Sequence, residues 1–219
     1  MSKKAILIGA TGLIGANLLE KLLASSNYTE VLVIARKKIN INNPKLKQLT
    51  INLDEMHLHT DEITGDDVFC CLGTTVKKTP NLELYKKIDY QYPLDLADIA
   101  LKNGAKTYHL VSSVGADAKS KIFYTRTKGE VERALQAIPF QSLNIYRPSL
   151  LDGNRNEGRK GENVMIVVMR MINPILVGGL RKYRSIKIEK VAAAMINQAG
   201  KESKGIHIYA SDEIEQLGY

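Results

Sequence analysis

Short runs of apolar residues alternate with longer amphipathic stretches through the first two thirds of the chain. Runs such as residues 5–8 and 31–35 are continuously apolar, which is typical of strands that are covered on both faces. Strands are predicted over residues 4–9, 30–35, 48–53, 67–72, 107–112 and 142–146. Helices are predicted over residues 13–24, over 82–102 with a break at Pro93, and over 124–137. This alternation predicts an α/β domain with a doubly wound parallel sheet.

After Pro148 the pattern changes. A polar stretch over residues 152–162 predicts a loop, and an apolar helix over 164–172 follows it. A helix over 188–199, a strand over 205–209 and a short terminal helix complete the chain. These segments are too few and too interspersed for a second core, so residues 1–219 are predicted to form a single domain. Residues 151–219 are expected to complete the sheet and to cover the binding site.

The composition excludes several classes of protein. Hydrophobic residues make up 44% of the chain and charged residues 25%, which excludes disordered and fibrous architectures. No apolar run approaches the ~18 residues needed to cross a bilayer. Residues 1–4 lead directly into a strand and leave no room for a signal peptide. We therefore expect a cytoplasmic protein with no membrane partner.

Cysteine and histidine residues give little support to a disulfide or a metal site. Cys70 and Cys71 are neighbours on a predicted strand, so their side chains point to opposite faces, which disfavours a disulfide between them. His57 and His59 lie on a short strand or loop with no third ligand nearby. His109 lies inside a strand and is interpreted as a buried side chain with satisfied hydrogen bonds. No metal is expected.

The chain carries 31 Lys and Arg against 23 Asp and Glu, a net charge of +8. Such a surplus suits nucleic acid, a membrane surface or a phosphate-rich small molecule, and charge alone does not choose among them. Aromatic and basic residues do not interleave regularly along the chain, so nucleic acid is an unfavoured partner.

A glycine-rich turn joins the first strand to the first helix. The segment Gly9-Ala-Thr-Gly-Leu-Ile-Gly15 supplies glycine for a sharp turn, for close approach of backbone N–H groups to a pyrophosphate, and for tight packing of helix on sheet. The anion would sit at the helix N-terminus, where free N–H groups and the helix dipole favour negative charge. The predicted dinucleotide-binding residues of this turn are Gly9, Thr11, Gly12, Leu13, Ile14 and Gly15.

The end of the second strand indicates which dinucleotide is bound. An NAD site usually has an acidic residue there, which bonds the ribose 2′-hydroxyl. This chain has Arg36 and Lys37 instead, and cations suit a 2′-phosphate. NADP(H) is therefore predicted in preference to NAD(H), the alternative being a solvated basic turn.

A serine, a tyrosine and a lysine follow in an order that suggests catalysis. Ser112 and Ser113 end the fifth predicted strand, and Tyr124 and Lys128 lie four residues apart on one helix face. A lysine ammonium beside a phenol stabilises the phenolate, so Tyr124 could exchange a proton with a carbonyl oxygen as hydride is transferred. A serine at the strand end would orient that carbonyl.

Five motifs in this order resemble the short-chain dehydrogenase/reductase superfamily, and most closely its atypical branch of Tat-interactive-protein-like oxidoreductases. The motifs are Gly9-Ala-Thr-Gly-Leu-Ile-Gly15, Phe69-Cys-Cys-Leu-Gly-Thr-Thr75, Ser112-Ser-Val-Gly-Ala-Asp117, Tyr124-x-x-x-Lys128-Gly-Glu-Val-Glu132 and Tyr146-Arg-Pro-Ser149. The resemblance covers nearly the whole chain and implies a Rossmann-like fold.

The resemblance also implies roles for individual residues. Tyr124 matches the catalytic tyrosine, Lys128 matches the lysine that also holds the nicotinamide ribose, and Ser113 matches the catalytic serine better than Ser112. The further positions that it implies for contact with the cofactor are Asn52, Leu53, Leu72, Gly73, Thr74, Arg147, Pro148, Leu151 and Arg159. Asp89 stands where many members of the superfamily have an asparagine, and the large substrate domain of nucleotide-sugar epimerases is missing.

These observations predict an NADP(H)-dependent oxidoreductase that transfers hydride to or from a small carbonyl or alcohol. The alternative is an NADP(H)-binding regulatory or redox-sensing protein with little turnover. Nucleic-acid binding is a third and weaker interpretation, supported by charge alone. The oligomeric state is open, and a homodimer is compatible with the sequence.

Overall fold

The computed structural model describes residues 2–153, 172–201 and 203–219. The strands are β1 (Lys3–Ile8), β2 (Tyr28–Ala35), β3 (Leu46–Thr50), β4 (Asp67–Cys70), β5 (Thr107–Val111), β6 (Ser142–Arg147), β7 (Leu151–Asp152), β8 (Ile186–Lys187) and β9 (Gly205–Ala210). The α-helices are α1 (Leu13–Ala24), α2 (Leu82–Lys86), α3 (Tyr92–Lys102), α4 (Phe123–Gln136), α6 (Ile188–Ala199) and α7 (Ser211–Leu217). The 3₁₀ segments are η1 (Leu53–Glu62), η3 (Asn173–Ile175) and η4 (Gly178–Tyr183), and η2 (Lys87–Gln91) is a π-helical turn.

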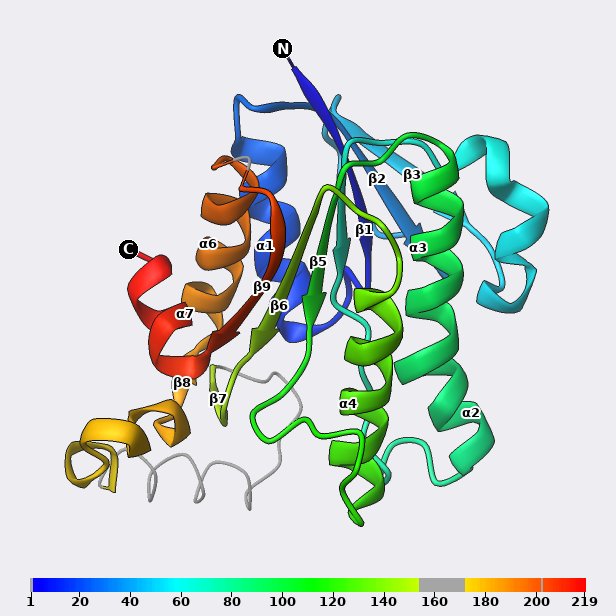
Figure 1. Cartoon of the computed structure of the whole chain (residues 1–219). Helices are drawn as coiled ribbons and strands as arrows, with labels where there is room; N and C mark the ends of the chain where they lie inside the picture. The colour runs from blue at the N-terminus through cyan, green and yellow to red at the C-terminus, as the bar shows by residue number, and fades with distance from the viewer. Residues whose placement is uncertain (1, 154–171, 202) are drawn as a thin grey trace.

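Seven of the strands form one parallel sheet in the order β3-β2-β1-β4-β5-β6-β9 (Figure 1). The order reverses at β1, because β2 and β3 extend the sheet on one side and β4 on the other. Ligands of open α/β sheets bind beyond the carboxyl ends of the strands at such a reversal. The predicted single α/β domain with a doubly wound parallel sheet is confirmed, and β9 lies beside β6 at its edge.

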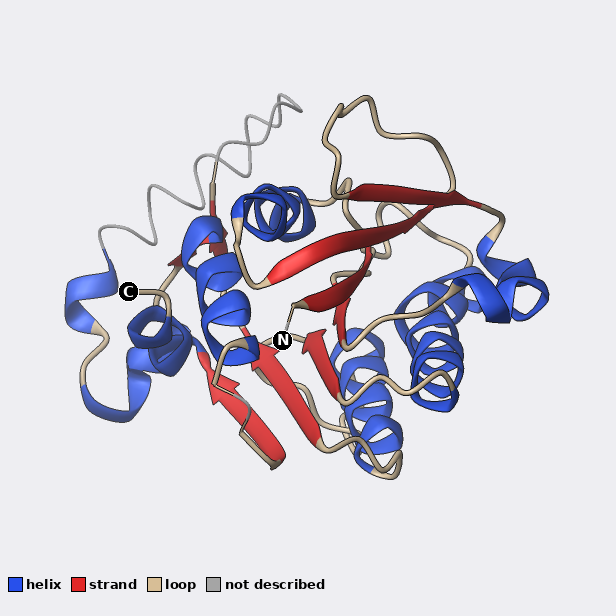
Figure 2. Cartoon of the chain, turned by 90° about the horizontal axis from the view of Figure 1, so that it is seen from above, coloured by secondary structure: helices blue, strands red, loops and turns tan. Residues whose placement is uncertain are grey.

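Helices cover both faces of the sheet (Figure 2). On β1, Ala5 and Leu7 pack into the cluster formed with α1, α6 and α7, whereas Ile6 and Ile8 pack into the cluster formed with α3 and α4. Each fully buried Leu or Ile side chain of this strand contributes about 1.5–3 kcal/mol. Continuously apolar strands therefore arise, as predicted, from burial on both faces.

A column of aromatic side chains crosses the sheet on its α1 face. The Phe69 ring stacks on His109 with 4.7 Å between ring centroids. The next centroid distances along the column are 6.0 Å from His109 to Tyr146 and 5.3 Å from Tyr146 to Tyr209. His109 is fully buried, and its Nδ1 lies 3.1 Å from the Tyr146 hydroxyl. Its Nε2 has no hydrogen-bond partner among the described residues, so the predicted full satisfaction of His109 is wrong for one nitrogen.

The third strand ends earlier than predicted. Thr50 is its last residue, and the Asn52 side chain accepts a hydrogen bond from the Asp54 N–H at 3.3 Å, which caps η1. His57 and His59 therefore lie on a 3₁₀ helix and not on a strand or loop. Within residues 2–153, 172–201 and 203–219, no group of three His, Cys, Asp or Glu side chains could hold a metal ion.

The long helix predicted over residues 82–102 breaks before Pro93 and not at it. The Tyr92 N–H donates to the Lys87 carbonyl, five residues earlier, which is the π-helical bond of η2. Pro93 lies in the first turn of α3 and has no N–H to donate to the preceding turn. The helix predicted over 164–172 lies almost wholly outside the described residues. Among the described helices, none is long and apolar enough to cross a membrane.

Candidate cofactor-binding and catalytic site

The glycine turn lies at the point where the strand order reverses. Gly9 has a φ of +84°, and a Cβ there would lie 2.5 Å from the Cys71 carbonyl oxygen. A Cβ on Gly15 would overlap the Gly9 carbonyl oxygen. Gly9 therefore allows the sharp turn beside β4, and Gly15 allows α1 to pack tightly against that turn.

The N-terminus of α1 opens at this turn. Gly12 is the N-cap residue in an extended conformation, and no side chain caps the helix. The first turn of α1 contains no acidic residue. Thr11 and Gly12 are exposed, Leu13 is half-buried and Ile14 is buried in the core. The unbonded N–H groups and the positive end of the helix dipole can therefore hold an anion.

The cations predicted to select the cofactor lie at the same edge of the sheet. Ile34 of β2 pairs with Ile8 of β1, so the exposed Arg36 and Lys37 follow directly beside the glycine turn. Asn52 follows β3 on the far side of β2, and its side chain is used to cap η1. Leu53 beside it is buried in the core.

The loop after β4 starts beside the end of β1, where the Cys71 N–H donates to the Ile8 carbonyl at 2.9 Å. Leu72 and Gly73 precede Thr74, whose N–H donates to Asp89 Oδ2 at 2.9 Å. The hydroxyl of the buried Tyr85 donates to the Thr74 carbonyl at 3.4 Å. These bonds hold the loop onto η2 and α2.

Lys128 lies beneath this loop. Its side chain is 6% exposed, and Nζ lies 2.8 Å from Asp89 Oδ1. A Cβ on Gly73 would lie 3.6 Å from Nζ. Burial by itself lowers the pKa of Lys128, but the Asp89 carboxylate and then Tyr124 outweigh burial, so the pKa of the ammonium is raised. Tyr124 and Lys128 lie four residues apart on α4, which places them one turn apart on the same face of the helix.

The two serines after β5 have different environments. Ser112 Oγ donates to Glu132 Oε1, and the same carboxylate accepts from Arg147 Nε at 3.0 Å and 3.2 Å. The Glu132 hydrogen bonds raise the pKa of Arg147. Ser113 Oγ is buried and has no hydrogen-bond partner among the described residues. The Arg147 guanidinium is therefore committed to Glu132, whereas the Ser113 hydroxyl is available.

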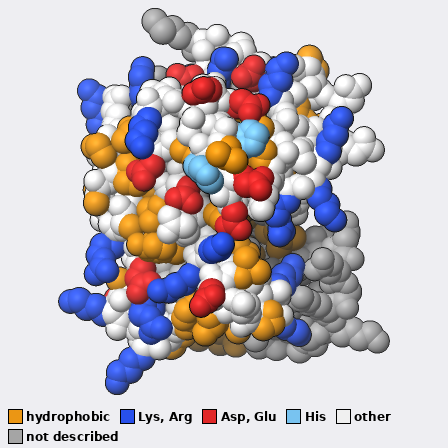
Figure 3. All heavy atoms as spheres, turned by 90° about the vertical axis from the view of Figure 1, so that its right-hand side faces the viewer, with side chains coloured by type: hydrophobic (Ala, Val, Ile, Leu, Met, Phe, Trp, Pro, Cys, Tyr) orange, Lys and Arg blue, Asp and Glu red, His pale blue; other side chains and the backbone are white. Residues whose placement is uncertain are grey.

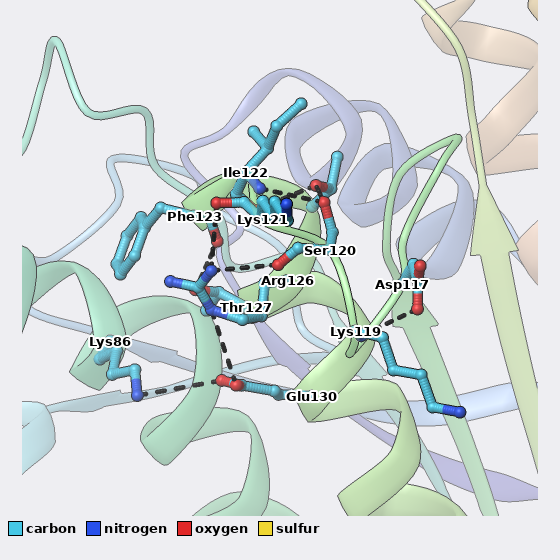
Figure 4. A network of polar contacts seen from close by, with 11 residues as sticks. Lys86, Asp117, Lys119, Ser120, Lys121, Ile122, Phe123, Arg126, Thr127 and Glu130 are labelled. Carbon is cyan, nitrogen blue, oxygen red and sulfur yellow. Dashed lines mark hydrogen bonds and ion pairs between the residues drawn. The ribbon is translucent and has the colours of Figure 1, made fainter.

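The start of α4 is anchored by a network of polar contacts (Figure 4). Arg126 Nη1 donates to the carbonyl oxygens of Ser120 and Lys121 at 3.0 Å and 3.2 Å. Glu130 lies one turn further, with Oε1 4.0 Å from Arg126 Nε. These contacts hold the loop that immediately precedes Tyr124, so the backbone that carries the tyrosine has a defined position.

The remaining predicted positions lie further along the sheet. Pro148 is buried, and its carbonyl accepts from the Val114 N–H at 2.9 Å, next to Ser113. Leu151 lies on β7 and pairs with Ile186, on the side of α6. Arg159 lies outside the described residues.

A cavity of about 490 Å³ lies next to the start of α7, which directly follows β9. It is lined by η4, β8 and α7, with cations at Arg181 and Lys187 and carboxylates at Asp152 and Glu215. The residues predicted for catalysis and cofactor binding do not line it.

Sequence reasoning missed two partners of the predicted site. Glu132 lies four residues after Lys128 on the inner face of α4. Because a carboxylate is rarely buried without a partner, its position on this face could have predicted that Glu132 binds other polar side chains. Tyr85, which holds the Thr74 carbonyl, lies on a helix too short for its apolar spacing to show a buried face.

Comparison with known proteins identifies the family. The sequence model of the NAD dependent epimerase/dehydratase family matches residues 5–212. The chain belongs to this family. It is 33% identical to the rat protein HTATIP2 over 165 residues, which is 74% of this chain and 68% of the relative. It is 36% identical to the mitochondrial protein fmp52 of Emericella nidulans over 165 residues, 72% of this chain and 71% of the relative.

Two solved structures of proteins in complex with NAD share the fold. The Bordetella bronchiseptica enzyme WbmH in complex with NAD⁺ has a TM-score of 0.71 at 15% identity, covering 100% of this chain and 80% of that one. MoeE5 in complex with UDP-glucose and NAD has a TM-score of 0.70 at 16% identity, covering 98% and 80%. The predicted membership of the atypical short-chain dehydrogenases/reductases and the Rossmann-like fold are confirmed.

Proposed function

We propose that this member of the epimerase/dehydratase family is an NADP(H)-dependent oxidoreductase that acts on a small carbonyl or alcohol. The observation that carries the proposal is the arrangement around Lys128. The lysine lies beneath the loop after β4, one helical turn from Tyr124 on the same face of α4, and the same loop starts beside Gly9. A dinucleotide site and a proton-transfer group thus share one edge of the sheet.

The residues present fit a dinucleotide cofactor. The first turn of α1 has no capping side chain and no acidic residue, which suits a pyrophosphate. Ser113 Oγ is a buried hydroxyl without a partner among the described residues, as expected of a group that awaits a substrate atom. When bound, NADPH supplies a hydride to the carbonyl carbon, and NADP⁺ accepts one in the reverse direction.

Three side chains would carry out the remaining chemistry. Ser113 donates a hydrogen bond that orients the carbonyl oxygen, and Tyr124 gives its hydroxyl proton to that oxygen as the hydride arrives. Lys128 stabilises the resulting phenolate and holds ribose hydroxyls of the cofactor. Leu72, Gly73 and Thr74 would line the cofactor, as the resemblance implies.

Replacing Tyr124 tests this assignment. Tyr124→Phe removes the acidic hydroxyl and keeps the ring, so NADPH consumption should vanish while the dissociation constant for NADPH stays within a few-fold. The measurement is a screen of aldehydes, ketones and nucleotide sugars, with NADPH binding followed by fluorescence. Tyr219→Phe makes the same change at a side chain that is 85% exposed and should leave both quantities unaltered.

Equal turnover by Tyr124→Phe and the parent protein would contradict the role of the tyrosine. Tight NADPH binding with no turnover of any substrate by the parent would favour the regulatory or redox-sensing alternative.

The preference for NADP(H) rests on Arg36 and Lys37. Both are exposed beside the glycine turn, where cations would pair with the 2′-phosphate. NADPH should raise the melting temperature more than NADH at equal concentration, and replacing both cations by alanine should remove the difference. Replacing the exposed Lys201 and Lys204 by alanine, at the other end of the sheet, is the matched control. Equal stabilisation by the two cofactors would contradict the preference.

Other partners receive less support. On the face shown in Figure 3, Lys and Arg side chains are interspersed with Asp and Glu and do not form one basic stripe of the kind that binds nucleic acid. The cytoplasmic location stays a prediction, since the fungal relatives are named mitochondrial proteins.

A further inference from the structure

Asp89 is a buried carboxylate at the centre of the π-helical turn η2. It is 1% exposed, while Lys87 and Gln91 at the ends of the turn are exposed. A π turn adds one residue to a helical turn, and such turns occur frequently at functional sites. A carboxylate is costly to bury unless cations or hydrogen-bond donors compensate its charge, so its contacts indicate its purpose.

Among the described residues, a cation and a backbone N–H lie against the Asp89 carboxylate. Oδ1 lies 2.8 Å from Lys128 Nζ, and Oδ2 accepts from the Thr74 N–H at 2.9 Å. Oδ1 has no hydrogen bond of good geometry among the described residues, so its contact with Nζ is an ion pair held by opposite charge. An asparagine offers one oxygen, and its NH₂ group would face either the ammonium or the Thr74 N–H. A neutral asparagine at this position would therefore lose the ion pair with Lys128.

The other titratable groups near Lys128 do not replace this charge. Burial raises the pKa of the Cys70 thiol on β4 and of the Tyr85 phenol on α2, so both are neutral near pH 7. Tyr124 on α4 is the remaining neighbour that acts on the lysine. Among the described groups that act on Lys128, Asp89 is the anion within ion-pair distance.

We propose that Asp89 is the positioning residue that keeps Lys128 protonated inside the buried site and holds it beneath the loop after β4. Without the carboxylate, an ammonium with a 6% exposed side chain would lose its proton more easily, because burial disfavours the charged form. The use of this charge in cofactor binding and proton transfer rests on the function proposed above. The ion pair itself does not, so it can be tested without cofactor or substrate.

The test is the pH dependence of unfolding by urea, without cofactor, for the parent protein, Asp89→Asn and the double variant Asp89→Asn/Lys128→Met. In the unfolded chain the lysine titrates near pH ~10.4 in every case. In the parent protein Lys128 is charged in both the folded and the unfolded state at neutral pH. The Asp89–Lys128 pair therefore does not make the free energy of unfolding depend on pH in this range. In Asp89→Asn the folded state would hold a neutral lysine while the unfolded state holds a charged one, so acid favours unfolding.

The folding equilibrium constant of Asp89→Asn, divided by that of the parent protein, should therefore fall as pH is lowered from about 9 to about 6, by up to about tenfold per pH unit. The double variant should differ from the parent by a constant factor across this range. Asp54→Asn removes an exposed carboxylate that pairs with Lys87 at 2.9 Å, and it should show no such slope.

A constant ratio between Asp89→Asn and the parent protein would overturn the proposal, because Lys128 would then keep its proton without Asp89. If Asp89→Asn does not fold, Lys128→Met tests the same pair from the other side. It leaves the carboxylate buried without its cation, so the stability of this variant relative to the parent should rise as pH falls from about 7 to about 5. A pH-independent difference would likewise overturn the proposal. Absence of NADPH binding would refute the proposed function and leave this result intact.

Discussion

At the scale of the residue, a single hydrogen bond distinguishes the environments of the adjacent Ser112 and Ser113. Ser112 and Ser113 are equally compatible with a strand-end hydroxyl in the sequence. In the structure Ser112 bonds to Glu132, which also receives the Arg147 guanidinium, whereas Ser113 Oγ has no partner among the described residues. The first hydroxyl is used for stability, and the second is available for a ligand.

Substituting each serine by alanine should separate the two roles. Ser112→Ala removes a donor to a buried carboxylate and should lower the free energy of unfolding by about 1–3 kcal/mol. Ser113→Ala removes an unsatisfied buried hydroxyl, so the free energy of unfolding should change by less than about 0.5 kcal/mol, while turnover should fall at least about tenfold. Urea unfolding and NADPH consumption measure the two effects. Loss of turnover in Ser112→Ala alone would reverse the assignment.

At the scale of the element, the sequence predicts what depends on long apolar patterns. The bounds of α1 and α6 agree with the prediction to the residue, because apolar spacing and clear end signals coincide there. The tyrosine and lysine fall on one face of α4 as their spacing requires. The glycine turn is predicted for the same reason, since its glycines are required by backbone contacts that any strand–turn–helix of this kind must make.

The elements that were not predicted from the sequence depend on single contacts or are too short to show a pattern. η1 replaces the end of a predicted strand because Asn52 caps it, and η2 replaces a break at Pro93. Two-residue strands such as β7 leave no periodic pattern to read. The ion pair between Asp89 and Lys128 joins residues that are 39 positions apart in the sequence. It forms because η2 packs against α4, which no local sequence pattern predicts.

Close packing between elements also explains one residue of the motif that follows the lysine. A Cβ on Gly129 would overlap the backbone nitrogen of Ala118, so α4 approaches the loop before it only because this position has no side chain. The same loop is held by Arg126 through the carbonyls of Ser120 and Lys121. Gly129 therefore allows the packing that positions Tyr124 and Lys128 on α4.

At the scale of the whole molecule, the aromatic column links stability to pH. Its strands β4, β5, β6 and β9 lie side by side in the sheet, and His109 stands between Phe69 and Tyr146. Burial, and to a lesser degree the charge of Lys3, lowers the pKa of His109 to about 3. In the unfolded chain a histidine titrates near ~6.5. Between these values the unfolded state binds a proton that the folded state does not bind, so acid favours unfolding.

The free energy of unfolding should therefore fall as pH is lowered from about 6.5 to about 4.5, with His109 contributing about 2–3 kcal/mol of the loss. His109→Gln keeps a polar side chain that does not titrate, so this variant should lose that part of the slope even if it is less stable at pH 7. His57→Gln changes an exposed histidine in the same way and should retain the full slope of the parent protein. Urea unfolding at closely spaced pH values measures all three proteins. Parallel curves for His109→Gln and the parent would mean that His109 takes up its proton inside the folded sheet, which the stacked rings and the neighbouring Tyr146 hydroxyl argue against.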